Sequence, residues 1–138
     1  MTVKHRYKPA TMHEILQNPN GGLAKDMLKR AVKVQAEAKK NLQRPPKRVN
    51  TGALRASITI TPFLADGYPA MRIGSGLEYA KWVHDGTGIY GPNHQMIEPK
   101  TAKALHWEGP GGVNVFAKKS RGMPGNPFLK DALKAAKL

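Results

Sequence analysis

The sequence predicts an α+β fold in which a long N-terminal amphipathic helix and a C-terminal helix pack on a mostly antiparallel β-sheet, with long loops. Apolar residues recur at helical spacing in one long segment near the start and one short segment at the end. Between them lie short stretches of alternating apolar and polar residues, separated by Gly- and Pro-rich turns. No long helical segments are interleaved with these strands, so parallel crossovers are not expected.

Chain length and composition restrict the classes of protein. A chain of 138 residues favours a single domain, and the absence of Cys excludes disulfides, thiolate zinc sites and thiol catalysis. No segment approaches the roughly 20 apolar residues of a membrane span. The basic N-terminus has no apolar core of a secretory signal. We therefore expect no membrane partner and synthesis in the cytoplasm, with use there or in a particle assembled there.

The net charge indicates an anionic partner. Lys and Arg number 23 against 9 Asp and Glu, giving +14. Such an excess is typical of proteins that meet nucleic acid or an acidic protein surface. A protein that merely tolerates excess lysine is the alternative.

The first 20 residues show no clear period and are interrupted by Pro9 and Pro19. They predict an N-terminal arm (1–20), with one helical turn at 12–17, ahead of a single α+β domain (21–138). From Leu23, apolar residues recur at spacings of 4, 4, 3, 4 and 4, which predicts one face of a long helix ended by Pro45-Pro46. These apolar residues are Leu23, Met27, Ala31, Val34, Ala38 and Leu42.

The segment "RPPKRVNTGALRASI" predicts an extended linker followed by a helical turn at 53–56. Asn50 or Thr51 can cap this turn, and Gly52 permits it. The next stretch, "SITITPF", alternates like a half-buried strand, with Leu54 and Ile58 directed into the core. An Asp-Gly turn then leads into the returning strand "PAMRIGS", whose Met71 and Ile73 are expected to point inward.

The second half of the chain predicts a short helix, three strands and a final helix. The short helix covers 78–84, packs on the sheet through Tyr79, Trp82 and Val83, and ends at Asp85-Gly86. "MIEP", "AKALHWEG" and "VNVFAKK" read as strands, the last with Val113, Val115 and Ala117 on one face. Pro127 suits the first turn of the final helix. Its apolar stripe consists of Phe128, Leu129, Ala132 and Leu133.

Motifs for catalysis are weak. "NTGALRAS" has one glycine and lacks the lysine of a phosphate-binding loop, and "IGSGLEY" lacks a third glycine. His84, Asp85 and His94 bracket a Gly-rich loop, and Glu98 follows, but no His-x-x-x-His or His-x-His spacing supports zinc. The sequence therefore favours a protein that is not an enzyme and has no cofactor. A hydrolase or nuclease using His84, Asp85 and His94 is an alternative.

Four segments together resemble a family of tail-component proteins of tailed bacteriophages, the small neck or head–tail joining proteins of long-tailed siphophages. In chain order they are "VNTGALRASI", "GLEYAKWVHDGTG", "IEPKTAKAL" and "GMPGNPFLKDAL". The resemblance runs from about Leu23 to Leu133. It departs at "RGMPG", where relatives often carry His before Pro-Gly, and it leaves out the first 20 residues.

The resemblance implies a structural virion protein assembled in the host cytoplasm. It would form a homo-oligomeric ring, hexameric or alternatively dodecameric, around double-stranded DNA. Neighbouring head-completion or connector proteins and tail-tube proteins would be its partners. A sequence-neutral nucleic-acid-binding protein is the alternative. Candidate subunit-interface or DNA-channel residues are Lys29, Lys33, Lys40, Arg48, Arg55, His84, Asp85, Tyr90 and Arg121.

Most motif residues are expected to have structural roles instead. Thr51 would cap and Gly52 would turn the chain, while Gly86 and Gly88 would adopt positive φ. Gly86–His94 and Gly109–Gly125 are candidate loops for reaching neighbouring subunits. The residues assigned to core or turn roles are Thr51, Gly52, Leu54, Tyr79, Trp82, Gly86, Gly88, Pro127, Phe128 and Leu129.

Overall fold

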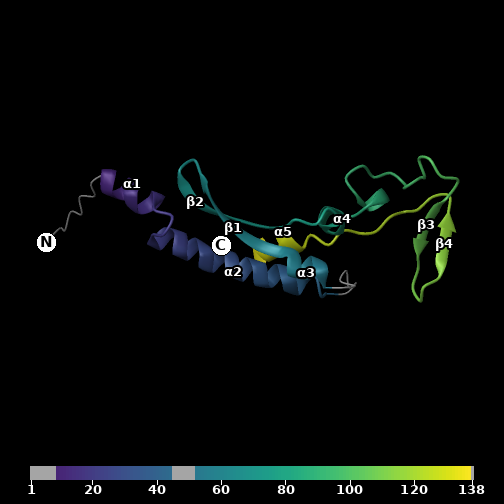
Figure 1. The fold of residues 1–138 in the computed structure, drawn as a ribbon, viewed down its shortest axis with the longest axis horizontal. Helices are drawn as coiled ribbons and strands as arrows, with labels where there is room; N and C mark the ends of the chain where they lie inside the picture. The colour runs from purple at the N-terminus through teal and green to yellow at the C-terminus, as the bar shows by residue number, and fades with distance from the viewer. Residues whose placement is uncertain (1–8, 45–51, 138) are drawn as a thin grey trace.

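The computed structural model describes residues 9–44 and 52–137. It contains two two-stranded antiparallel sheets, β1–β2 and β3–β4 (Figure 1). In chain order the elements are α1 (Pro9–Gln17), α2 (Gly22–Asn41), α3 (Ala53–Ser57), β1 (Ile58–Ala65), β2 (Tyr68–Ser75), α4 (Tyr79–Asp85), the 3-10 helix η1 (Gly88–Tyr90), β3 (Leu105–Glu108), β4 (Asn114–Ala117) and α5 (Phe128–Ala135).

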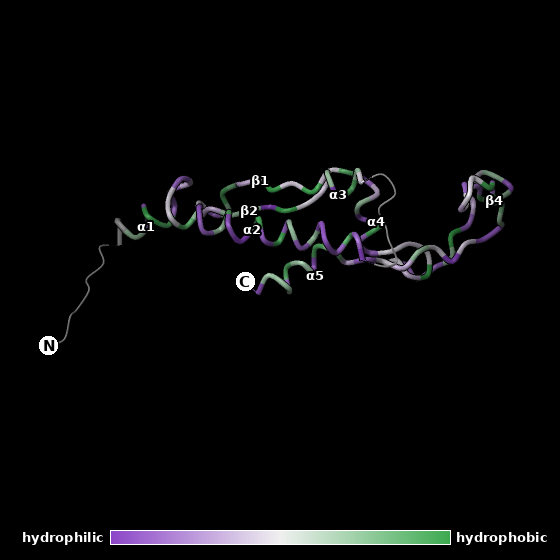
Figure 2. Tube along the Cα trace, turned by 90° about the horizontal axis from the view of Figure 1, so that it is seen from below, coloured by the Kyte–Doolittle hydropathy of each residue, from purple (hydrophilic) through white to green (hydrophobic). Residues whose placement is uncertain are grey.

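The molecule is elongated. Its body consists of α2 with β1–β2 along one side and α5 along another, while α1 and the β1–β2 turn form one end (Figure 1). The β3–β4 hairpin lies at the opposite end, and both views show it apart from the body (Figure 2). The predicted α+β class is confirmed. The strands form two separate hairpins instead of one sheet.

The long helix is confirmed almost residue for residue. α2 spans Gly22–Asn41 and is followed by Leu42, and its predicted stripe faces the interior. Ala31, Val34, Ala38 and Leu42 are buried, whereas Leu23 and Met27 at its start are half-buried. Helical periodicity predicted this element well because burying one apolar face is what stabilises a helix of this length.

One core joins α2 to the elements around it. Asn41, buried at the end of α2, donates from Nδ2 to the Phe128 carbonyl oxygen at 3.1 Å. Asn126 returns a bond from its own Nδ2 to the Asn41 carbonyl oxygen at 3.2 Å, so the end of α2 is fixed to the start of α5. The buried apolar members of this core are Val34, Ala38, Leu42, Leu54, Ile58, Ala80, Val83, Phe128 and Ala132.

The β1–β2 hairpin turns where the sequence predicts. Asp66 and Gly67 have φ of 52° and 83°, as a two-residue turn with positive φ at both positions requires. Ala65 and Tyr68, which flank the turn, form a hydrogen-bonded residue pair. From there along the strands, non-hydrogen-bonded and hydrogen-bonded pairs alternate. Pro62 and Pro69 both fall in non-hydrogen-bonded pairs, where a backbone N–H would point away from the partner strand. Each outer edge therefore lacks one donor, which disfavours the addition of a third strand.

Two strand predictions are wrong in extent. The segment "MIEP" is not a strand: Ile97 makes only an isolated antiparallel bridge with Ser120, with N–O distances of 2.8 and 2.9 Å. β4 begins at Asn114, so Val113 lies in the turn and is exposed instead of sharing an inward face with Val115. Strand formation depends on a partner segment distant in sequence, and local alternation does not reveal it.

Two helices were predicted correctly in position, but some of the side chains expected to face inward are exposed. In α4 the buried residues are Ala80 and Val83, while Tyr79 and Trp82 are exposed, so the prediction that both pack on the sheet is wrong. Tyr79 and Trp82 each precede a buried residue by one position and therefore point about 100° away from it. In α5, Phe128 is buried and Leu129 packs against the core as predicted, but Leu133 is exposed.

The N-terminal helix is longer than the predicted single turn. α1 spans Pro9–Gln17 and leans on the β1–β2 turn, where the rings of His13 and Tyr68 lie 6.3 Å apart. The boundary between an arm (1–20) and a domain (21–138) stays a prediction. No helix among residues 9–44 and 52–137 is long and apolar enough to cross a membrane.

The predicted linker falls largely outside the described residues. Arg48, Asn50 and Thr51 belong to this part, so their expected interface and capping roles stay predictions. Gly52, the residue before α3, has φ of 76°, which confirms the predicted glycine turn.

Candidate functional site

Two distant chain segments lie side by side where the body meets the projecting hairpin. The Thr87 N–H donates to the Met123 carbonyl oxygen and the Ile89 N–H to the Arg121 carbonyl oxygen, both at 2.9 Å. The Thr87 hydroxyl oxygen accepts from the Met123 N–H, also at 2.9 Å. Residues 86–91 and 121–126 therefore form one backbone-bonded unit directly after α4 and before α5.

Glycines make this approach possible, and we call Gly86, Gly88, Gly122 and Gly125 together the glycine crossing. Gly86, Gly88 and Gly122 have φ of 87°, 64° and 82°, which confirms the positive φ predicted for the first two. Close contact is a second requirement. A Cβ on Gly88 would overlap the Arg121 carbonyl, and one on Gly125 would lie 2.6 Å from the Asp85 carbonyl carbon. Sequence reasoning missed Gly122 and Gly125, because nothing local indicates that "GTG" meets "RGMPG".

Beyond the crossing, residues 92–120 extend away from the body, and we call them the arm. The sequence predicted two reaching loops, Gly86–His94 and Gly109–Gly125. Residues 86–91 of the first and 121–125 of the second are held in the crossing, and the element that projects is the β3–β4 hairpin. Leu105 pairs with Ala117 and Trp107 with Val115, which places four apolar side chains on one face. On the other face the rings of His106 and Phe116 stack at 4.7 Å.

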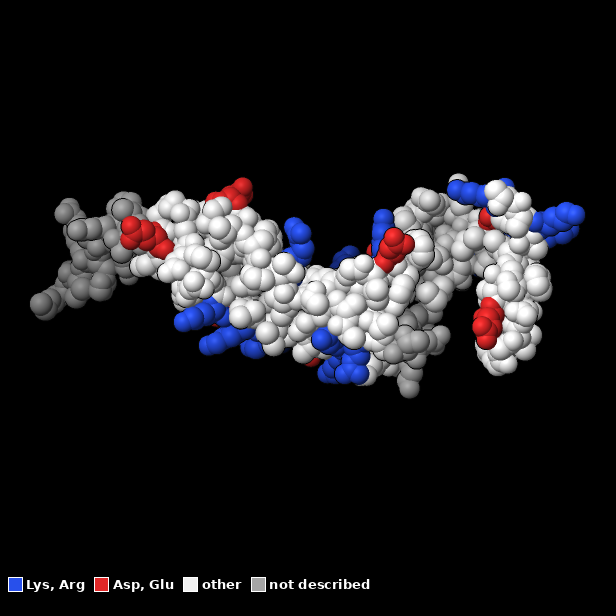
Figure 3. Space-filling view, viewed as in Figure 1, with Lys and Arg blue, Asp and Glu red and all other residues white. Residues whose placement is uncertain are grey.

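Three predicted lysines form a stripe on the solvent face of α2. Lys29, Lys33 and Lys40 lie within about 40° of one another around the helix axis, opposite the buried alanines. The stripe extends over about 16 Å. Lys40 Nζ is 3.8 Å from Glu37 Oε1, whereas Lys29 and Lys33 form no ion pair with any described residue. Figure 3 shows basic side chains gathered along the edge of the molecule where α2 lies.

Other predicted residues gather around a shallow cavity of about 420 Å³. His84, Asp85, Tyr90 and His94 line it together with Lys130. His84 Nδ1 lies 2.7 Å from Asp85 Oδ1, and its ring meets Phe128 edge-on at 5.4 Å. His94 Nδ1 is 3.1 Å from the Ile89 carbonyl oxygen. Across the described parts of the chain, no group of three or more His, Cys, Asp or Glu side chains could hold a metal ion.

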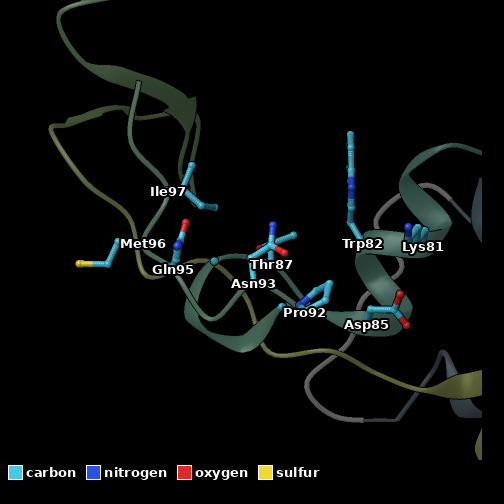
Figure 4. Close-up of a pocket in the computed structure, with 12 residues that line it drawn as sticks. Lys81, Trp82, Asp85, Thr87, Pro92, Asn93, Gln95, Met96 and Ile97 are labelled. Carbon is cyan, nitrogen blue, oxygen red and sulfur yellow. The ribbon is translucent and has the colours of Figure 1, made fainter. Parts of the chain in front are cut away.

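A second cavity, of about 410 Å³, lies between α4 and the base of the arm (Figure 4). Trp82 stands at one side of it with 57% of its surface exposed, and Met96 and Ile97 lie across from it on the arm. An exposed indole beside a hollow is typical of a protein interface. The sequence prediction had assigned Trp82 to packing on the sheet.

The remaining predicted residues lie apart from these cavities. Arg55 is exposed on α3, and the Arg121 side chain is exposed although its carbonyl is bound in the crossing. On the arm, Lys119 Nζ lies 2.7 Å from Glu98 Oε1. This hydrogen bond, followed by the charge of Glu98, raises the pKa of Lys119, so its ammonium group stays protonated at neutral pH.

Comparison with known protein families identifies a relationship. The model of the HK97-gp10-like family, described as "Bacteriophage HK97-gp10, putative tail-component", matches residues 16–86. This range contains α2, α3, β1, β2 and α4, and ends at the first glycine of the crossing. No curated protein and no solved structure matches the chain. Because the family match covers more than half of the 138 residues, the chain belongs to this family of bacteriophage tail-component proteins.

Proposed function

We propose that this tail component is a structural protein of the phage neck, which joins the head to the tail. Copies assemble into a ring around the DNA channel, with sixfold symmetry or alternatively as a dodecamer. Its neighbours are head-completion or connector proteins on one side and tail-tube proteins on the other. It acts in the virion after assembly in the host cytoplasm. Membership of the tail-component family carries this proposal.

The shape and surfaces of the subunit support assembly. A ring built by head-to-tail contacts needs two different surfaces on each copy. The elongated molecule presents the arm at one end and the α1–β1–β2 end at the other (Figure 1). Its excess of positive charge suits acidic neighbours or the DNA backbone. The proposed role is structural and requires no catalytic residue.

Electron microscopy of the purified protein, alone and mixed with tails that lack it, tests the proposal. Rings at the head-proximal end of the tail, and their incorporation into the joint of complete particles, are expected. Protein that never associates with tails or with the head–tail joint would exclude a neck role.

The basic stripe on α2 favours a second candidate function, sequence-neutral DNA binding. Replacing Lys29, Lys33 and Lys40 with Gln should reduce the slope of log Kobs against log salt concentration by about 3, since each phosphate contact contributes about 0.9. Fluorescence anisotropy with duplexes of unrelated sequence, titrated at several salt concentrations, measures this slope.

A variant with the same charge change at another place is the control. Replacing Lys130, Lys134 and Lys137, which lie on or beside α5, removes three charges but leaves the stripe intact. If both triple variants weaken binding equally, the effect reflects net charge and not the α2 face. Absence of binding by the unmodified protein at moderate salt removes this candidate.

A further inference from the structure

We propose that the β3–β4 arm of one copy packs on the opposite end of a second copy, on the surface formed by α1 and the β1–β2 turn. The proposal rests on the ring assembly proposed above and names the contact between adjacent subunits. Three observations carry it: an uncovered apolar hairpin, an apolar acceptor surface at the far end of the molecule, and opposite charges on the two surfaces.

The arm needs a covering layer. An isolated two-stranded hairpin is marginally stable at best in water. β3–β4 lies apart from the body in both views (Figures 1 and 2), with 41% of Trp107 and 69% of Phe116 exposed. Leu105, Val115 and Ala117 form the rest of its apolar face with Trp107. The glycine crossing and the bridge between Ile97 and Ser120 hold the two chain segments together at the base of the arm.

The acceptor surface, which we call the tip patch, lies at the other end of the molecule. Exposed apolar side chains from α1 and from both strands beside the turn lie there. Phe63 and Tyr68 share one face of the β1–β2 hairpin, since the pairs Phe63–Ala70 and Ala65–Tyr68 are two positions apart. Because the arm and the tip patch lie at opposite ends of the molecule, the arm cannot pack on the tip patch of its own copy (Figure 1). The members of the tip patch are Met12, Ile15, Phe63 and Tyr68.

Charge favours this pairing over other contacts between copies. Lys100, Lys103 and Lys118 on the arm form no ion pair with a described residue, and neither do Glu14 and Asp66 beside the tip patch. Figure 3 shows acidic side chains at the tip end, whereas on the arm basic ones gather where the hairpin begins. Glu108, at the end of β3, is an acidic residue on the hairpin itself. Contact of the arm with the α2 face would bring like charges together.

The contact joins side-chain faces and does not extend a sheet. Pro62 and Pro69 remove a backbone donor from each outer edge of β1–β2, so strand addition there is disfavoured. The Arg72 guanidinium lies 5.0 Å from the centroid of the Phe63 ring, so this cation is already engaged beside the patch. Since arm and tip patch differ, the same contact repeats from copy to copy, which closes a ring or extends a filament.

The absence of Cys makes the contact directly testable by chemical crosslinking. Trp107→Cys protein, altered on the apolar face of the arm, is mixed with Phe63→Cys protein and treated with a short bismaleimide, alone and with tails. The matched control replaces Phe63→Cys, at a position 40% exposed, with Val32→Cys, which lies on α2 and is 50% exposed. Covalent dimers are expected from the 107–63 mixture, and neither from the 107–32 mixture nor from Trp107→Cys alone.

Charge reversal provides an independent readout. In the Phe63→Cys partner, replacing Glu14 and Asp66 with Lys should lower the yield of 107–63 dimers about tenfold, because attraction becomes repulsion. Replacing Glu78 and Asp131 with Lys makes the same charge change away from the tip patch and should leave the yield unchanged. Equal losses from both pairs would overturn the assigned contact.

Imaging of the same samples separates the two proposals. Rings without 107–63 crosslinks overturn the arm contact and leave the neck ring standing. Crosslinked open chains without closed rings support the arm contact and count against the ring. Samples with neither rings nor crosslinks, with or without tails, overturn both.

Discussion

Replacing Phe128 with Ala should lower the free energy of unfolding by about 3 to 5 kcal/mol, the usual cost of emptying a large buried aromatic site. Phe128 is 1% exposed, and its carbonyl oxygen accepts the hydrogen bond from Asn41. It belongs to the core cluster that joins α2, α4 and α5. Urea denaturation measures this loss of stability. Unfolding is followed by circular dichroism at 222 nm, the usual helix signal, to which α2 contributes most as the longest helix.

Phe116→Ala is the matched control, because the same side chain is removed from a position that is 69% exposed on the arm. Its effect on the unfolding of the body should stay within about 0.5 kcal/mol. Comparable losses from both variants would mean that the arm packs on the body, contrary to the structure and to the proposed contact between copies.

Replacing Gly88 with Ala should cost about 2 to 5 kcal/mol. About 1 to 2 kcal/mol arises from placing a side chain at positive φ, and about 1 to 3 kcal/mol from forcing the crossing apart. The added Cβ would overlap the Arg121 carbonyl, which is fixed by its bond from the Ile89 N–H. Amide exchange at Thr87 and Ile89 should accelerate, and the urea midpoint should fall.

Gly111→Ala separates the two causes. Gly111 also has positive φ, at 80°, but an added Cβ would meet nothing within 4 Å. This variant should show only the backbone cost, about 1 to 2 kcal/mol locally, and leave exchange at Thr87 and Ile89 unchanged. If Gly88→Ala and Gly111→Ala behave alike, contact across the crossing contributes nothing to stability.

Elements whose structure is determined by residues close together in the sequence were predictable. The period of α2, the Asp66-Gly67 turn and the start of α5 beside Pro127 each depend on residues a few positions apart. Helical and turn geometry act at that range, so the local pattern is sufficient. The lysine stripe on α2 was predictable for the same reason, since helix geometry alone places Lys29 and Lys33 on the solvent face.

Features that depend on distant partners were not predictable. The orientation of Trp82 is decided by which face of α4 meets the core, and an aromatic at helical spacing does not reveal whether it faces inward. Gly122 and Gly125 acquire their role only through contact with a segment more than 30 residues earlier. Likewise, the strands near the chain's end alternate well locally, but their separation from β1–β2 follows from pairing that no local pattern encodes.

The glycine crossing has a mechanical consequence. Both chain segments that leave the arm pass through it and enter the body, one into α4 and the other into α5. Tension applied to the arm therefore runs along two parallel covalent routes to helices anchored by Val83 and Phe128. The backbone hydrogen bonds of Thr87 and Ile89 join the two chain segments side by side. The covalent chain therefore carries a stretching force on the arm, and these hydrogen bonds resist its twisting.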